Sequence, residues 1–123
     1  MLKTAAIIFG LFFIVAGLAG FSASLAPGGM LFGLFMVGTV HNIIHLASGI
    51  VALMCAFAGA GASRKYFQIF GIVYLLVALL GFAYGNKPLL GMVEHNTYDI
   101  WLHIVIAAAS LYLGFGARDT STA

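Results

Sequence analysis

Five polar side chains interrupt two apolar stretches of this sequence. His41, Asn42 and His45 lie in one stretch, and Asp99 and His103 lie in the other. Imidazole nitrogens and carboxylate oxygens can together hold Zn, Cu, Ni or Fe, whereas Mg and Ca prefer oxygen ligands alone. A helix would place His41 and His45 on one face, because residues four positions apart lie one turn apart. The spacing therefore permits a transition-metal site. Its candidate ligands are His41, His45, Asp99 and His103.

The composition of the chain indicates what surrounds these side chains. Of the 123 residues, 63% are hydrophobic and 7% are charged, whereas average proteins carry about a quarter charged residues. Five basic and three acidic residues are too few to cover a water-soluble surface. The formal net charge of +2 comes from scattered residues, so we expect no nucleic-acid partner. The sequence predicts an integral membrane protein whose main partner is the lipid bilayer.

Four apolar stretches are long enough to cross a bilayer, since a hydrocarbon core of about 30 Å requires about 20 helical residues. We predict one all-α domain, residues 1–123, that forms a four-helix membrane bundle. Its helices are expected at about residues 4–24, 39–61, 66–84 and 97–115. The first stretch exceeds the apolar part of a signal peptide, which spans about 7 to 15 residues, so we expect it to remain as a helix. Residues 30–37 are apolar but too short to cross, and we expect them to lie flat on the outer face or to dip into it.

Helical periodicity separates two faces in the second stretch. The face with the polar side chains also carries Gly49, Ala52 and Ala56, while the opposite face carries branched side chains such as Ile43 and Ile50. Polar groups at membrane depth are costly and usually face the bundle interior. We therefore expect the polar and small residues to contact protein and the branched residues to contact lipid.

Glycines recur along the helix faces, including a GxxxG pair at Gly81 and Gly85. Such faces allow helix backbones to approach closely. They predict tight helix contacts and offer a route to a homo-oligomer or a larger membrane complex. Tyr74 lies on the same stripe as Gly81, so we expect its hydroxyl group to bond a neighbouring helix.

The positive charges predict the orientation. Lys3, Arg64, Lys65 and Arg118 lie at one set of helix ends, and only Lys87 lies at the other. Because cytoplasmic segments are enriched in Lys and Arg, we expect both termini in the cytoplasm of a bacterium and the chain in its inner membrane. All four histidines then lie toward the outer face. His45 and His103 are each about 9 Å deep at a rise of 1.5 Å per residue, so their helices can meet at that depth.

The chain resembles a bacterial domain-of-unknown-function family of small four-helix membrane proteins. The resemblance rests on an N-x-x-H-L-x-x-G motif that begins at Asn42 and on a D-x-x-L-H motif that begins at Asp99. It also covers Phe32-Gly33-Leu34-Phe35 and Gly71-Ile72-Val73-Tyr74. The family resemblance implies the four-helix fold and the polar set Asn42, His45, Asp99 and His103, and it assigns no activity.

Several functions are compatible with this polar set, and we expect a structural or accessory membrane protein rather than an enzyme. In such a protein Asp99 accepts a hydrogen bond from His45 or His103, and Asn42 joins an interhelical network. The first alternative is a transition-metal site. A second is b-type haem held by His45 and His103. A third is a proton or small-solute relay through Asp99 and His103. His41 and His95 could instead be water-exposed residues at the interface.

Overall fold

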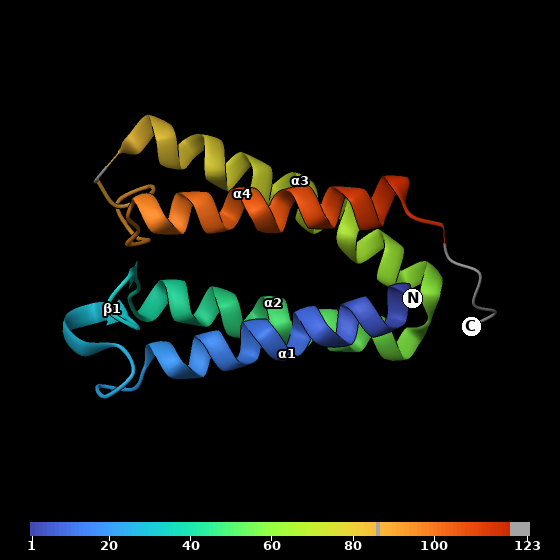
Figure 1. The fold of residues 1–123 in the computed structure, drawn as a ribbon, viewed down its shortest axis with the longest axis horizontal. Helices are drawn as coiled ribbons and strands as arrows, with labels where there is room; N and C mark the ends of the chain where they lie inside the picture. Colours follow the sequence, from blue (N-terminus) through green and yellow to red (C-terminus); the bar gives the residue numbers. More distant parts are fainter. Residues whose placement is uncertain (86, 119–123) are drawn as a thin grey trace.

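The computed structural model describes residues 1–85 and 87–118, and its architecture is a bundle of four long helices (Figure 1). These are α1 (Leu2–Gly20), α2 (Thr39–Ala58), α3 (Ala60–Tyr84) and α4 (Thr97–Leu111), which continues as a π-helical turn over Tyr112–Gly116. All four are long and apolar enough to cross a membrane, α4 together with its π-helical turn. The predicted all-α membrane bundle is confirmed.

The helices are arranged as two pairs. α1 lies along α2, and α3 lies along α4 (Figure 1). The sequence predicts the break between α2 and α3 at about residues 62–65, whereas in the structure only Gly59 separates the two helices. Gly59 has a φ of 127°, which favours glycine, so the chain reverses at this single residue. The hydroxyl of Ser63 then donates a hydrogen bond to the Gly59 carbonyl at 2.8 Å and supports the first turn of α3.

We call the end of the bundle with the α2–α3 joint and the start of α1 the terminal end, and the opposite end the hairpin end. At the hairpin end, α1 is followed by a 3-10 turn (Pro27–Gly29) and by strands β1 (Met30–Leu31) and β2 (Phe35–Met36). The strands pair antiparallel, with Leu31 opposite Phe35. Residues 30–37 thus contain a small β-hairpin, whose buried Leu31 and Val37 pack with Ala19 of α1.

Glycines bring the helices of each pair into close contact. A Cβ atom at Gly49 of α2 would lie 2.6 Å from the Gly10 carbonyl oxygen of α1, and one at Gly114 would lie 2.7 Å from the Gln68 backbone nitrogen. Gly81 packs against Ile100 in the same way. The expectation of close packing is wrong for Gly85, which faces open space and ends α3 with a φ of 62°.

The two faces of α2 are as the periodicity predicted. Its buried residues are His41, Asn42, His45, Ser48, Gly49, Ala52 and Ala56. Its branched residues Ile43 and Ile50 are exposed on the opposite side. The apolar surface of the bundle is therefore available to lipid, while the polar side chains of α2 point to the interior.

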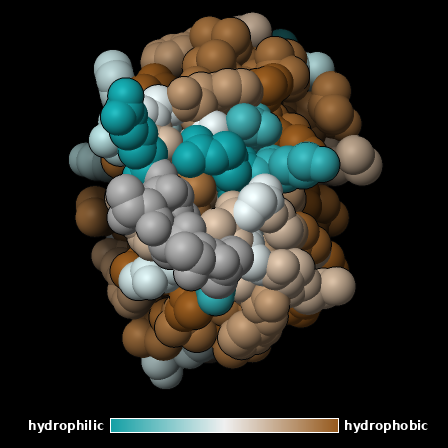
Figure 2. All heavy atoms as spheres, turned by 90° about the vertical axis from the view of Figure 1, so that its right-hand side faces the viewer, coloured by the Kyte–Doolittle hydropathy of each residue, from teal (hydrophilic) through white to brown (hydrophobic). Residues whose placement is uncertain are grey.

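Hydrophilic side chains gather at the terminal end, surrounded by apolar ones (Figure 2). At this end of the bundle, Arg64 of α3 donates hydrogen bonds to the Gly114 carbonyl at 3.2 Å and to the Ala117 carbonyl at 2.8 Å. Gln68 also donates to the Gly114 carbonyl, at 2.9 Å. These donors satisfy carbonyl groups that the end of a helix leaves without intrahelical partners.

Candidate metal centre

Three histidines converge between α2 and α4 near the hairpin end. His41 and His45 lie one turn apart on the buried face of α2, and His103 lies on the buried face of α4. Each offers one ring nitrogen, and the three nitrogens lie within 4.8 Å of one another. The side chains are only 2%, 6% and 5% exposed, respectively. The structure therefore brings His45 and His103 together between α2 and α4.

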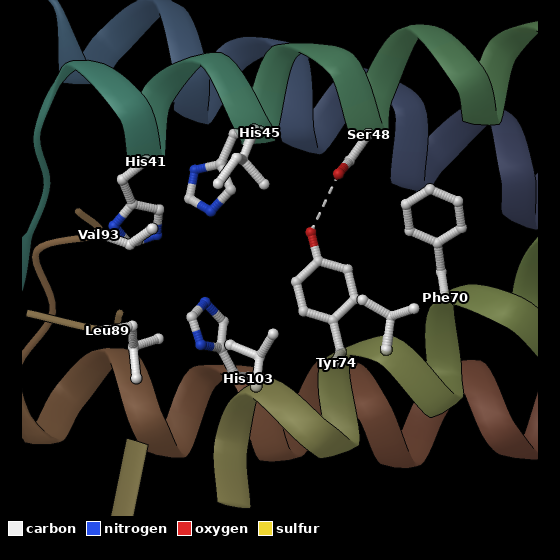
Figure 3. A pocket seen from close by; sticks show the side chains of 11 residues that line it. His41, His45, Ser48, Phe70, Tyr74, Leu89, Val93 and His103 are labelled. Atoms are coloured by element: carbon white, nitrogen blue, oxygen red, sulfur yellow. Dashed lines mark hydrogen bonds between the residues drawn. The ribbon is translucent and has the colours of Figure 1, made fainter. Parts of the chain in front are cut away.

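The rings are arranged around a common space. His45 and His103 face each other across it, with His41 beside His45 on α2 (Figure 3). The ring centroids of His41 and His45 are 4.4 Å apart, and those of His41 and His103 are 5.8 Å apart. We call His41, His45 and His103 the histidine triad.

A backbone contact determines which nitrogen of His41 carries the proton. Its Nδ1 lies 2.8 Å from the carbonyl oxygen of Glu94, in the loop before α4. Because a carbonyl oxygen can only accept, Nδ1 donates, and the Nε2 of a neutral ring keeps its lone pair. That Nε2 is buried and has no hydrogen-bond partner among the described residues. Metal-binding histidines commonly show this arrangement, with one nitrogen oriented by a carbonyl group and the other free for the ion.

The distances within the triad are close to those of a metal site. With metal–nitrogen bonds of about 2.1 Å, the nitrogens of a tetrahedral site lie roughly 3.4 Å apart. The triad nitrogens, all within 4.8 Å of one another, would close by at most about 1.4 Å to reach that spacing.

The triad borders a cavity of about 160 Å³ with mostly apolar walls. Its lining includes Val77 of α3 and Leu89 and Val93 of the α3–α4 loop. On the side away from the loop, the Tyr74 hydroxyl donates to Ser48 Oγ at 3.3 Å. The predicted bond from Tyr74 to a neighbouring helix is confirmed. The small volume suits an ion or a very small ligand rather than an extended one, and the three imidazoles are the groups in its lining that can coordinate an ion.

The other two predicted site residues lie outside the triad. The carboxylate of Asp99 accepts a hydrogen bond from the Asn96 backbone N–H at 2.9 Å. The Asn96 side chain in turn accepts one from the Asp99 backbone N–H, so the two residues form a capping box at the start of α4. Asp99 lines a second cavity of about 230 Å³, which it shares with His45. Asn42 instead packs against Gly20 of α1.

His95 is the fourth histidine of this end of the bundle. It lies in the loop before α4 and is only 2% exposed. Both of its ring nitrogens are buried without a hydrogen-bond partner among the described residues. The expectation that His41 and His95 could be water-exposed is therefore wrong for both, because the loop folds over them.

Two contributors to the site were missed by the sequence reasoning. Ser48 follows His41 by seven residues, so the helical repeat that grouped the histidines could have included it. The Glu94 carbonyl gives no sequence signal, because it is a backbone group 53 residues away from His41. Only the path of the loop brings it to the ring.

The four helices and the buried histidines define a small multi-pass membrane protein with a histidine cluster inside its bundle. Residues 3–116 match the family model described as a domain of unknown function (DUF4383), and the chain belongs to this family. The predicted membership in a domain-of-unknown-function family is confirmed. No curated protein and no solved structure matches the chain.

Proposed function

We propose that this protein binds a transition-metal ion within the membrane through His41, His45 and His103. The observation that carries the proposal is the convergence of three buried imidazole nitrogens within 4.8 Å of one another. Imidazole suits Zn, Cu, Ni and Fe, and three histidines are a known donor set for Zn. The bond from His41 to the Glu94 carbonyl supports this role because it leaves Nε2 free to bind an ion.

A purely structural hydrogen-bond network explains the histidines less well. Such a network would pair their nitrogens, yet Nε2 of His41 and Nδ1 of His45 have no partner among the described residues. Buried polar groups left unpaired typically cost about 1 to 3 kcal/mol each. An ion bound at the triad would give a reason to retain these groups in an apolar interior.

The geometry favours a metal ion over b-type haem and over a proton or small-solute relay. A cavity of about 160 Å³ is smaller than the roughly 300 to 1,000 Å³ of pockets that hold drug-sized molecules, and this size favours an ion over a haem macrocycle. A relay through Asp99 and His103 would need contact between them, whereas the Asp99 carboxylate bonds the Asn96 backbone. The buried carboxylate of Asp99 lies one helical turn from His103 and would partly offset the charge of a bound cation.

The proposed site lies toward the outer face of a bacterial inner membrane. Lys3 in the first turn of α1, Arg64 and Lys65 near the start of α3, and Arg118 after the π-helical turn all lie at the terminal end. This distribution supports a cytoplasmic location of that end. The triad, at the hairpin end, would then meet ions from the periplasm or the cell exterior. We propose a binding or accessory role and no enzymatic reaction.

The test is metal binding by the detergent-purified full chain. We expect elemental analysis to find about one Zn²⁺ per chain after equilibration, and Zn²⁺ at a hundredfold excess over Kd to stabilise the fold by about 2.7 kcal/mol. His45→Ala and His103→Ala should each lose both effects. Gln68→Ala, which removes a hydrogen bond at the terminal end, serves as the control and should keep Zn²⁺ binding. A wild-type chain that takes up no Zn²⁺, Cu²⁺, Ni²⁺ or Fe²⁺ would refute the proposal.

A further inference from the structure

His95 is a buried imidazole that the histidine triad does not use. It is 2% exposed, and neither ring nitrogen has a hydrogen-bond partner among the described residues. Buried side-chain nitrogen atoms are nearly always paired, so an imidazole with two unpaired nitrogens requires an explanation. A ligand that is bound only part of the time would supply one.

Backbone geometry places His95 next to the triad. The Glu94 carbonyl oxygen that accepts the proton of His41 lies 2.8 Å from its Nδ1. Standard peptide dimensions put the Cα of the following residue about 2.8 Å from that same oxygen. The Cα of His95 therefore lies within about 5.6 Å of Nδ1 of His41. In this structure the ring nitrogens of His95 lie outside the group of three triad nitrogens that are within 4.8 Å of one another.

The backbone on both sides of His95 is anchored. On one side, the Glu94 carbonyl is bonded to His41. On the other, Asn96 caps α4, and its side-chain amide donates to the Leu34 carbonyl at 2.7 Å. We expect His95 to turn toward the triad by rotation of its side chain, while these contacts hold the loop backbone in place.

The triad alone would leave one position of a tetrahedral ion open. Structural zinc sites are closed by four protein ligands, whereas catalytic sites keep three and bind water or substrate at the fourth position. We propose that His95 supplies the fourth nitrogen when an ion is bound, which makes the centre a closed site of four histidines. This inference rests on the proposed metal-binding function, and it assigns the α3–α4 loop the role of covering the ion on the outer side.

The experiment compares coordination in the wild-type chain and in His95→Ala, with Co²⁺ and Zn²⁺ as probes in detergent. In the wild type we expect the intense visible bands of tetrahedral Co²⁺ and four nitrogen neighbours by zinc X-ray absorption. His95→Ala should bind at least about tenfold more weakly and replace one nitrogen by water oxygen, and added free imidazole should restore the wild-type spectrum. Met92→Ala, an exposed position of the same loop, is the matched control and should leave spectrum and affinity unchanged.

A second variant keeps the test decisive if His95→Ala does not fold. His95→Gln preserves much of the side-chain volume and should likewise lose one nitrogen neighbour. Should either folded variant retain the wild-type spectrum and affinity while His45→Ala abolishes binding, the triad would be the whole site and the role of His95 would be refuted. A wild-type chain that binds no metal would instead refute the proposed function itself.

Discussion

The side-chain amide of Asn42 on α2 occupies the space into which a side chain at Gly20 of α1 would project. A Cβ atom at Gly20 would lie 2.5 Å from Cγ of Asn42 and 2.9 Å from its Nδ2. The absence of a side chain at Gly20 thus lets α1 approach the turn of α2 that carries His41 and His45. This contact between α1 and α2 at the hairpin end holds the turn of α2 that carries the two histidines of the proposed metal centre.

Gly20→Ala should destabilise the fold because the new methyl group collides with the Asn42 amide. Overpacking of this kind costs about 1 to 3 kcal/mol, and the displaced turn of α2 should also weaken Zn²⁺ binding. Thermal unfolding in detergent measures the first effect and calorimetric titration the second. The matched control is Gly61→Ala, since a Cβ atom there meets open space and the position lies in a helix. Equal stability of the two variants would contradict the structural role of Gly20.

Tyr74→Phe should lower stability by about 0.5 to 1.5 kcal/mol, because it removes the hydroxyl that donates to Ser48 Oγ and leaves that oxygen with one partner fewer. The substitution keeps the ring, so the stacked contact with Phe13 of α1 should persist. Chemical denaturation in mixed micelles gives the free energy of unfolding. Tyr112→Phe, at an exposed position, should leave it unchanged, and a comparable loss in that variant would show that the Tyr74 hydroxyl has no special role.

Arg64→Met should loosen the end of α4. The variant removes the donors to the Gly114 and Ala117 carbonyls, and hydrogen bonds from a charged donor contribute about 1.5 to 3 kcal/mol when well shielded. We expect faster amide hydrogen exchange over residues 112–118, with little change at the hairpin end. Lys65→Met removes an adjacent exposed charge as the control. If amide hydrogen exchange over residues 112–118 is equally fast in both variants, the loss of a positive charge would explain it rather than the loss of the hydrogen bonds to the carbonyl groups.

Orientation can be measured by cysteine labelling of intact cells in a Cys55→Ala background. Met92→Cys, at the hairpin end, should react with a membrane-impermeant maleimide, and Gly61→Cys, at the terminal end, should react only after the membrane is permeabilised. Both positions are exposed, and neither substitution changes the charge balance that directs insertion. The reverse labelling pattern would place the proposed metal centre on the cytoplasmic side.

Sequence reasoning performed unevenly around the site. The buried face of α2 followed from periodicity, because lipid accepts Ile43 and Ile50 but not His41 or His45. Asp99 was grouped with the histidines, yet it caps α4 with Asn96, and the local N-x-x-D spacing offered a signal for that role. At Gly85 the GxxxG spacing was misleading, since the helix had already ended and a Cβ atom there would meet nothing within 4 Å in the described part of the chain.

The sequence by itself determined the membrane class, the four crossings and the inward direction of the polar side chains. These properties depend on local hydrophobic pattern, because a bilayer requires helices whose backbone groups are satisfied within each segment. Only the tertiary structure decided that His41 and His45 meet His103, that the loop buries His95 and that Glu94 orients His41. Those contacts depend on how the helices are rotated and packed and on the path of the α3–α4 loop. They join residues of different segments, and the periodicity within one helix carries no information about such contacts.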